Sequence, residues 1–308
     1  MTETNIQTVI ILVNYNSAND TKSCIQSVLD SDNQKQPFII LIDNNSSESL
    51  KCIAHEFPEV KIIKNDSNAG FGKANNIGIE WAKKNLEFDF LCLLNNDTVV
   101  ERGFLQKLIA PFLDDPQVGI TTGRIYYESN QDIIWYGGGD INYSRGWPKI
   151  TNFNQTPSSE GALKSREVTF ASGCLMMFSK ESILKIGGFD EFFFMYCEDL
   201  ELSIRTLKFG YKIYYNSDAI IYHKVQGDKK MEEKGLKIKN PKLKFLFINM
   251  KRNQFYTFNK HLKGFKKLRF KSIFFLELLY ISSKFFFLGQ LNIFLWWAII
   301  FKQKKNIF

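Results

Sequence analysis

Three clusters of polar residues each follow directly after a short apolar run, and their side chains are well suited to ligand chemistry. The clusters are residues 14–17, 43–47 and 95–97, and they are rich in asparagine, aspartate and serine. Amides and carboxylates form directed hydrogen bonds, and carboxylate oxygens also bind hard divalent cations. One such cluster alone would indicate only a turn. Three of them favour a single binding site over three unrelated turns.

The apolar runs before these clusters predict the elements that position them. Runs without polar alternation are typical of strands buried on both faces of a parallel sheet, and stretches with helical spacing separate them. We therefore expect an α/β fold with a mostly parallel sheet and helices on both faces, in which ligands bind at the carboxyl ends of the strands. The expected strands are 8–13, 38–42, 60–63, 88–94 and 219–222, and the expected helices are 20–29, 49–55, 73–81 and 199–205.

A fourth cluster, residues 68–78, contains Gly70, Gly72 and Gly78. Glycines permit close backbone approach, and the helix that follows presents free N–H groups. The cluster matches neither the phosphate loop of nucleoside triphosphatases nor the dinucleotide-binding fingerprint. Taken alone, these glycines are equally compatible with phosphate contact and with a plain turn.

The composition excludes several classes of protein. The chain has 308 residues, 44% of them hydrophobic and 23% charged, with only seven prolines and five cysteines. It is therefore not a disordered, collagen-like or disulfide-scaffold chain, and the absence of a C-x-x-C spacing argues against a zinc ribbon. A reducing compartment is the simpler interpretation of so few cysteines. Residues 1–8 carry no lysine or arginine, and the apolar run after them is too short for a signal peptide. We expect the protein to stay in the compartment where it is made.

The charge is distributed unevenly along the chain. Residues 229–308 hold 19 Lys and Arg against 3 Asp and Glu, a net charge of +16, whereas residues 1–228 hold 21 against 29, a net charge of −8. The basic part also contains 14 of the 29 phenylalanines. This shift predicts two domains, 1–227 and 228–308. Basic residues among large apolar ones favour an anionic membrane surface as partner, with a helical cap as the alternative, and no motif indicates nucleic acid.

Two further segments carry expectations of their own. Residues 285–301 are apolar, but they are only 17 residues long and are flanked by lysines on both sides. We expect a helix that lies in the membrane interface rather than a span, with the protein attached peripherally to the cytoplasmic face of the cell membrane. Residues 126–170 show no clean period and are expected to form a mobile segment.

The ordered set of motifs resembles the inverting glycosyltransferases of family 2, which have the GT-A fold. The resemblance spans residues 7–225 and is strongest to the rhamnosyltransferase-like branch that builds bacterial surface polysaccharides. The motifs that carry it are 13–17, 42–47, 68–78, 94–97, 171–174, 187–191, 198–205 and 222–223.

The resemblance implies a nucleotide-sugar donor bound along the first strand ends. The backbone around Val13 and Tyr15, together with the Asp43 carboxylate, would hold the base and the ribose. Capping of the loop after the strand is the alternative role of Asp43. The remaining donor-binding residues implied by the resemblance are Asn14, Asn68, Gly70, Lys73 and Asn96.

The resemblance also implies a divalent cation, Mn²⁺ or Mg²⁺, held by Asp97 and His223. Asn95 stands where the family often has the first acid of an Asp-x-Asp motif, so Asp97 is the only carboxylate of its cluster. The donor diphosphate would supply further oxygen ligands, and a histidine ligand favours manganese. A histidine satisfied in the core is the alternative for His223.

The same resemblance assigns the general base to Asp199, which would take the proton from the acceptor hydroxyl as it attacks the anomeric carbon. Glu198, Glu201 and Arg205 would be supporting polar residues. Acids in the first turn of a helix also stabilise the helix dipole, which is the alternative role for Glu198 and Asp199.

The function implied is metal-dependent transfer of a sugar, rhamnose from dTDP-rhamnose in this branch, to a lipid-linked or growing surface-polysaccharide acceptor. The rival hypothesis is a catalytically silent GT-A-like binding scaffold at the membrane. Asn95 is the one feature that favours the scaffold, while the joint presence of Asp43, Asp97, Asp199 and His223 favours the enzyme. No motif indicates an oligomeric state.

Overall fold

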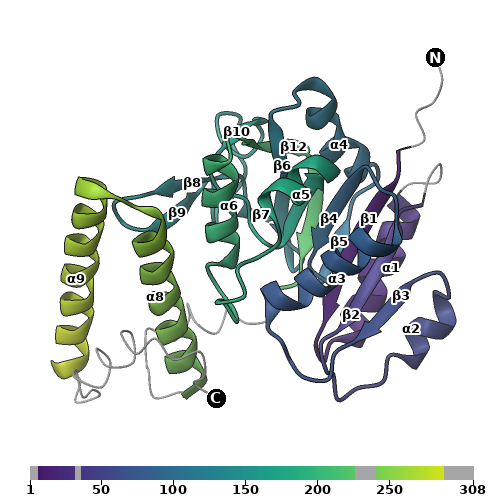
Figure 1. The fold of residues 1–308 in the computed structure, drawn as a ribbon, viewed down its shortest axis with the longest axis horizontal. Coiled ribbons are helices and arrows are strands. Elements are labelled where there is room, and N and C mark those ends of the chain that lie inside the picture. Colours follow the sequence, from purple (N-terminus) through teal and green to yellow (C-terminus); the bar gives the residue numbers. More distant parts are fainter. Residues whose placement is uncertain (1–5, 32–35, 226–240, 288–308) are drawn as a thin grey trace. The chain divides into compact units, whose positions relative to one another are not determined.

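The computed structural model describes residues 6–31, 36–225 and 241–287, and these form two units (Figure 1). The first unit comprises the described residues up to Asp140, together with Ile150–Phe194 and Glu198–Val225. The second unit comprises Ile141–Lys149, Met195–Cys197 and the described residues beyond Val225. Two short segments from within the first 227 residues thus belong to the second unit.

The first unit is built on a ten-stranded sheet. Its strands β1 (Thr8–Asn14), β2 (Phe38–Asp43), β3 (Lys61–Lys64) and β4 (Phe90–Leu94) pair in parallel in the order β4-β1-β2-β3. Strands β1, β2 and β4 are almost wholly buried, as their continuous apolar runs require. The predicted strands in this half of the sheet are confirmed to within two residues.

Helices connect the parallel strands, and α3 lies directly on β1 and β2. A Cβ atom on Gly78 would stand 2.7 Å from the side chain of Ile11, so glycine is what allows α3 to approach the strand so closely. Helix α3 begins at Phe71, two residues before the predicted start. The helices of this half are α1 (Ala18–Ser31), α2 (Lys51–Glu56) and α3 (Phe71–Asn85).

The other half of the sheet is mixed. Strand β11 (Leu175–Ser179) pairs antiparallel with β4 on one side and with β6 (Val118–Tyr127) on the other. Strand β12 (Lys212–His223) pairs in parallel with β6, and β5 (Thr98–Val100) pairs antiparallel with β12. The predicted α/β class is confirmed. The helices of this half are α4 (Phe104–Asp114), α5 (Lys180–Ile186) and α6 (Glu198–Lys208).

The segment 126–170 was expected to be mobile, and that expectation is wrong. The buried Tyr136 donates a hydrogen bond from its hydroxyl to the carbonyl of Phe170, and the Arg166 guanidinium donates to Gly137 and Thr151. These bonds join residues far apart in the sequence, so a local hydrophobic period does not predict them. The strands formed are β7 (Asn130–Tyr136), β8 (Gly139–Asn142), β9 (Trp147–Ile150) and β10 (Arg166–Val168).

The described part of the second unit contains α8 (Pro241–His261), α9 (Gly264–Phe287) and the turn between β8 and β9. The rings of Phe258, Phe270 and Phe274 are buried in it, and the centroids of Phe258 and Phe270 lie 5.0 Å apart. Gly146 in the β8–β9 turn leaves room for the ring of Phe270. Part of the phenylalanine content of this region therefore builds a core of its own.

Within residues 6–31, 36–225 and 241–287, no helix has the length and apolar character needed to cross a membrane. The apolar segment 285–301 lies largely outside these residues.

Candidate active site

Asn14, Asn96 and the start of α1 form one hydrogen-bonded network at the carboxyl edge of the parallel strands. The Asn96 side-chain amide donates to the hydroxyls of Ser17 and Thr21, at 2.7 and 2.6 Å. The Thr21 hydroxyl in turn donates to the Asn14 side-chain oxygen at 2.8 Å. The Asn14 amide donates to the Ser46 hydroxyl at 2.8 Å, which adds the loop after β2. The three polar clusters therefore lie together at one edge of the sheet.

Asp43 ends β2 and is buried within this edge. Its Oδ1 atom accepts a hydrogen bond from the backbone N–H of Ser46 at 2.9 Å, so it caps the loop that follows the strand. Val13 pairs with Ile42 in the neighbouring strand, and the Tyr15 ring is half exposed. Asp43 thus offers a fixed carboxylate at the end of β2, and Tyr15 offers an exposed ring just after β1; both kinds of side chain suit a nucleoside.

Asn68 and Gly70 shape the loop that leads into α3. The Asn68 side-chain oxygen accepts hydrogen bonds from the Asn44 side-chain amide and from the Gly70 N–H, both at 2.9 Å. Gly70 has a φ of +79°, and a Cβ atom there would collide with the carbonyl of Phe194. Only glycine fits both conditions, because a side chain at positive φ is strained and here has no space.

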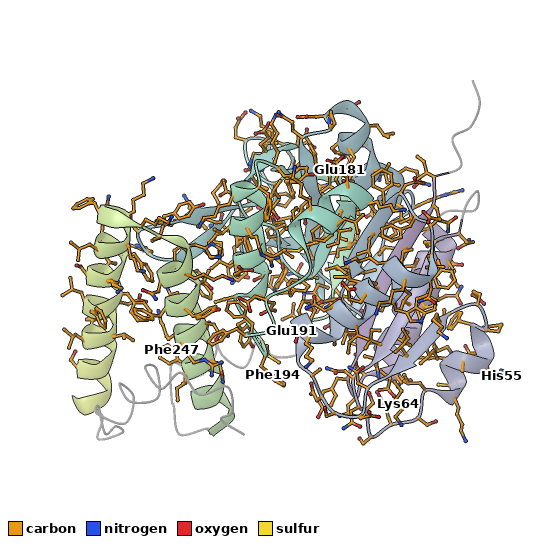
Figure 2. The ribbon with its side chains drawn as sticks, viewed as in Figure 1. His55, Lys64, Glu181, Glu191, Phe194 and Phe247 are labelled. Atoms are coloured by element: carbon orange, nitrogen blue, oxygen red, sulfur yellow. The ribbon has the colours of Figure 1, made fainter. Side chains whose placement is uncertain are left out.

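The segment before α6 lies against this loop, and Glu191 and Phe194 are labelled on it in Figure 2. The Phe194 carbonyl accepts a hydrogen bond from the Phe71 N–H at 3.0 Å. The ammonium of Lys73 lies 3.7 Å from the carboxylate of Glu191, and both side chains are about half exposed. This exposed pair contributes little to stability, so Lys73 remains available to an anionic ligand.

Asp97 and His223 meet across two paired strands. His223 ends β12 opposite Thr98 of β5, and its Nε2 atom lies 3.1 Å from Oδ1 of Asp97. The side-chain amide of Asn95 lies 3.5 Å from the same ring nitrogen. The structure thus brings together the two residues for which the sequence implied a shared cation.

The His223 ring is nearly enclosed, and its Nδ1 atom has no hydrogen-bond partner. Burial acts to lower the pKa of His223, but the neighbouring Cys174 and Asp97 raise it, and the net pKa lies well above the ordinary value. Trp135 of β7 packs edge-on against the imidazole, with ring centroids 4.6 Å apart. Sequence analysis placed Trp135 in a segment without regular structure and so missed this contact.

Glu198 and Asp199 open α6 in two different environments. Glu198 is buried, and its Oε2 atom has no hydrogen-bond partner. Burial raises the pKa of Glu198, and the adjacent charge of Asp199 raises it further. Both effects disfavour the ionised form of Glu198.

Asp199 is better supported as an anion. It is only partly buried, and it accepts hydrogen bonds from the backbone N–H groups of Gly173 and Leu200, at 3.1 and 2.8 Å. Burial raises the pKa of Asp199, but these two bonds oppose the rise. Its place in the first turn of α6 also favours a negative charge. Of the two carboxylates, Asp199 is the one whose surroundings better support a negative charge.

Residues Gly173 and Cys174 join the acidic end of α6 to the Asp97–His223 pair. Gly173 donates to Asp199, while the Cys174 carbonyl accepts a hydrogen bond from the Asn95 N–H at 3.0 Å. The motif 171–174 carries part of the family resemblance, but the resemblance implies no role for its residues. Its signal was the glycine itself, because a backbone N–H that approaches another residue closely needs a small side chain.

Glu201 and Arg205 lie one turn apart on α6 and form an ion pair at 2.8 Å, with Glu201 wholly buried. The Arg205 guanidinium also donates to the carbonyls of Ile186 and Gly188, both at 2.7 Å. These contacts hold α6 to the turn after α5. Glu201 and Arg205 therefore support the site indirectly, because they fix the position of α6.

Residues 9–187 match the family model described as glycosyl transferase family 2. The chain belongs to this family. The match begins at β1 and ends just after α5, so it covers more than half of the chain. The GT-A architecture and the glycosyltransferase class that the motifs implied are confirmed.

Among curated proteins, the chain is 24% identical to the rhamnosyltransferase WbbL of Escherichia coli over 67% of its own length and 79% of that protein. It is also 24% identical to an N-acetylglucosaminyl-diphospho-decaprenol L-rhamnosyltransferase of Mycobacterium tuberculosis, over 60% of its own length and 66% of that protein. It spans only 48% of a poly-β-1,6-N-acetyl-D-glucosamine synthase of Staphylococcus epidermidis, to which it is 25% identical over 69% of its own length.

Two solved structures share the fold. GalNAc-T7 with UDP, GalNAc and Mn²⁺ superimposes with a TM-score of 0.60 at 20% identity, over 79% of this chain and 48% of that one. The mannosyltransferase PcManGT of Pyrobaculum calidifontis with GDP-Man and Mn²⁺ gives a TM-score of 0.53 at 16% identity. The match covers 88% of this chain and 68% of that one. Both neighbours are glycosyltransferases whose structures contain Mn²⁺.

Proposed function

We propose that this family 2 glycosyltransferase transfers rhamnose from dTDP-rhamnose, with inversion, to a lipid-linked or growing surface-polysaccharide acceptor. The two rhamnosyltransferases among its relatives support the sugar, and the diphospho-decaprenol in one of their names supports a lipid-linked acceptor. The observation that carries the proposal is the pair of adjacent carboxylates at the start of α6. One is buried with an oxygen that has no hydrogen-bond partner, and the other is partly exposed and held by backbone N–H groups.

Asp199 is the proposed general base. Its carboxylate takes the proton from the acceptor hydroxyl while that oxygen forms a bond to the anomeric carbon. The bond from the anomeric carbon to the diphosphate breaks on the opposite face, and its electron pair leaves with the nucleoside diphosphate. Burial raises the pKa of Glu198, which disfavours a second negative charge beside the base.

Asp97 and His223 fit a divalent cation. A carboxylate oxygen and an enclosed imidazole nitrogen face each other at 3.1 Å, and this mixed set suits Mn²⁺ or Mg²⁺ completed by donor oxygens. When bound, the cation would neutralise charge on the leaving diphosphate. The protein would supply only these two side chains as ligands. No cluster of three or more His, Cys, Asp or Glu suited to a metal occurs among the residues that the structure describes.

The donor is assigned to the network at the strand ends. Asp43 and the exposed Tyr15 ring face the nucleoside in this proposal, and Asn14 and Asn96 hold the edge rigid through their shared hydrogen bonds. Asn68 and Gly70 set the course of the loop into α3, and Lys73 offers an ammonium to the diphosphate. The same edge carries the Asp97–His223 pair, so donor and cation would share one end of the sheet.

We further assign the second unit to an anionic membrane surface. One face of α9 carries large apolar side chains that are each more than half exposed, and exposed lysines and an arginine stand among them. This combination of apolar and basic side chains is typical of a helix that lies at a lipid interface. The apolar residues of this face are Phe265, Leu268, Leu276, Leu279 and Tyr280, and the basic ones are Lys266 and Arg269, with the exposed Lys263 just before the helix.

A thermal-shift screen of nucleotide-sugars with Mn²⁺, followed by transfer assays, tests the proposal. The true donor raises the melting temperature of the native protein, because only ligands that bind the folded state do so. We expect dTDP-rhamnose to give the largest shift and a product of inverted anomeric configuration. If the protein binds the nucleotide-sugar but transfers no sugar to any lipid-linked or glycan acceptor, the silent scaffold is favoured, in agreement with the presence of Asn95 in place of an acid.

A further inference from the structure

The second unit contains an open cavity of about 880 Å³. The β8–β9 hairpin contributes residues of both strands and of the turn to its lining, among them Arg145, Trp147 and Lys149, and α8 and α9 contribute the rest. The Gln254 side-chain amide donates to the Arg145 carbonyl at 2.8 Å, which ties the turn to α8. The volume is that of a small-molecule site rather than of a packing defect.

The lining is cationic. Arg145 and Lys149 have exposed side chains, and neither forms an ion pair with a carboxylate among the described residues. Lys251 is buried, with its ammonium 2.7 Å from the carboxylate of Glu277. The cavity thus holds three cations against one carboxylate, an excess of two positive charges. Such an excess suits a multiply charged anion, and Arg in particular matches phosphate oxygens.

The rest of the lining is largely apolar. Trp147 of β9 and Leu276 of α9 are exposed large side chains in the cavity wall, and Phe247 of α8, labelled in Figure 2, lines it too. A free phosphate or a sugar phosphate would leave this apolar wall in water. A ligand that joins an anionic head to a hydrocarbon chain uses both parts of the lining.

We propose that this cavity binds the diphosphate and the first isoprenoid units of the lipid-linked acceptor. The inference rests on the proposed function, because it takes the acceptor to be lipid-linked. Arg145 and Lys149 hold the diphosphate oxygens, Lys251 is kept in place by Glu277 as a buried third cation, and Trp147 and Leu276 cover the hydrocarbon.

The test measures binding of the full-length protein to phosphatidylcholine vesicles that contain decaprenyl diphosphate. The variant Arg145→Gln/Lys149→Gln removes two cavity cations. Lys263→Gln/Lys266→Gln is the matched control, since it removes two exposed cations of the same unit that do not line the cavity. We expect the cavity variant to lose about tenfold or more in affinity relative to the control, because hydrogen bonds to charged groups are the strong ones.

Two further probes separate the sources of the anion. On vesicles with phosphatidylglycerol in place of decaprenyl diphosphate, both double variants should weaken equally, and a selective loss by the cavity variant would mean a general lipid-headgroup site and overturn the proposal. Inorganic diphosphate should compete only weakly, and competition as strong as that of the lipid would overturn the assignment of the apolar wall. Trp147→Ala should weaken binding of the lipid, with Phe209→Ala, an exposed ring of the first unit, as its control.

Transfer assays distinguish failure of this inference from failure of the proposed function. If the enzyme glycosylates a diphosphate-linked lipid while both double variants bind decaprenyl diphosphate equally, the cavity assignment is wrong and the proposed function stands. If the enzyme transfers sugar only to water-soluble glycans and does not bind decaprenyl diphosphate, the lipid-linked acceptor and the cavity assignment both fail.

Discussion

Asn253 donates a hydrogen bond from its side-chain amide to the carbonyl oxygen of Tyr196, at 2.9 Å. The same amide donates to the carbonyl of Met195, also at 2.9 Å, and Asn253 is wholly buried. Tyr196 and Cys197 both have positive φ angles, +68° and +70°, a conformation that costs non-glycine residues about 1–2 kcal/mol each. The carboxylates Glu198 and Asp199 follow directly in the chain, so Asn253 fixes a strained backbone immediately before them.

Asn253→Asp tests this relationship. The replacement has nearly the same shape but cannot donate to the two carbonyls, so the strained turn should relax and displace Asp199. We expect kcat to fall by roughly tenfold or more while the KM for the donor stays close to the wild-type value. Asn259→Asp, on the same helix, is the control. Wild-type turnover in a folded Asn253→Asp enzyme would show that the turn does not position the base.

Asp199→Asn should reduce turnover by roughly 10²–10⁴-fold, because the amide cannot accept the proton of the acceptor hydroxyl. Donor affinity, measured by the thermal shift with nucleotide-sugar, should hardly change. Asp132→Asn replaces an exposed carboxylate of β7 and should be neutral. Near wild-type turnover in the Asp199 variant would move the role of base to Glu198 or Glu201.

Glu198→Gln should change how stability depends on pH. Burial, reinforced by the charge of Asp199, raises the pKa of Glu198 in the folded protein to about 8, from an ordinary value of 4.5. Between these values the folded state binds more protons than the unfolded state, so this group makes stability fall as pH rises. The variant removes that loss, and its melting temperature should exceed that of the wild type increasingly from pH 5 to pH 8. Glu160→Gln, exposed, is the control, and a parallel shift of both variants would refute the assignment.

Removal of divalent cations should abolish transfer. We expect EDTA to stop the reaction and Mn²⁺ to restore it, because Asp97 and His223 would hold the cation that binds the donor diphosphate. His223→Ala should raise the Mn²⁺ concentration needed for half-maximal activity. Full activity in EDTA would show that the reaction needs no metal. An unchanged Mn²⁺ requirement in His223→Ala would show only that His223 is not a ligand.

Attachment to membranes should depend on the exposed face of α9. Leu268→Glu/Leu279→Glu places two charges on the apolar face and should shift the full-length protein from the membrane fraction to the supernatant. Leu184→Glu, on an equally exposed leucine of α5, should leave the distribution unchanged. High salt should release part of the wild-type protein, because each Lys or Arg near an anionic surface contributes about 1 kcal/mol and is screened by salt. Wild-type protein that stays in the supernatant at low salt would refute membrane attachment.

The parallel half of the fold and its polar strand ends followed from the sequence. Continuous apolar runs such as 38–42 are signals of buried strands that can be read locally, and Asp43 follows its run directly. The carboxyl ends of parallel strands meet at one edge, so the neighbourhood of Asn14, Asp43 and Asn96 could be inferred without coordinates. The pairing of Asp97 with His223, 126 residues apart, came only from the resemblance to the family.

The tertiary structure decided what depends on contacts between distant segments. The strands within 126–170 are held by bonds such as that from Tyr136 to Phe170, which leave no period in the sequence. Glu198 and Asp199 are alike as neighbouring acids in the sequence. They differ in the fold because one is buried without a partner and the other accepts a hydrogen bond from Gly173. A pKa depends on burial and on neighbours brought from elsewhere in the chain, so only the folded structure distinguishes the environments of these two carboxylates.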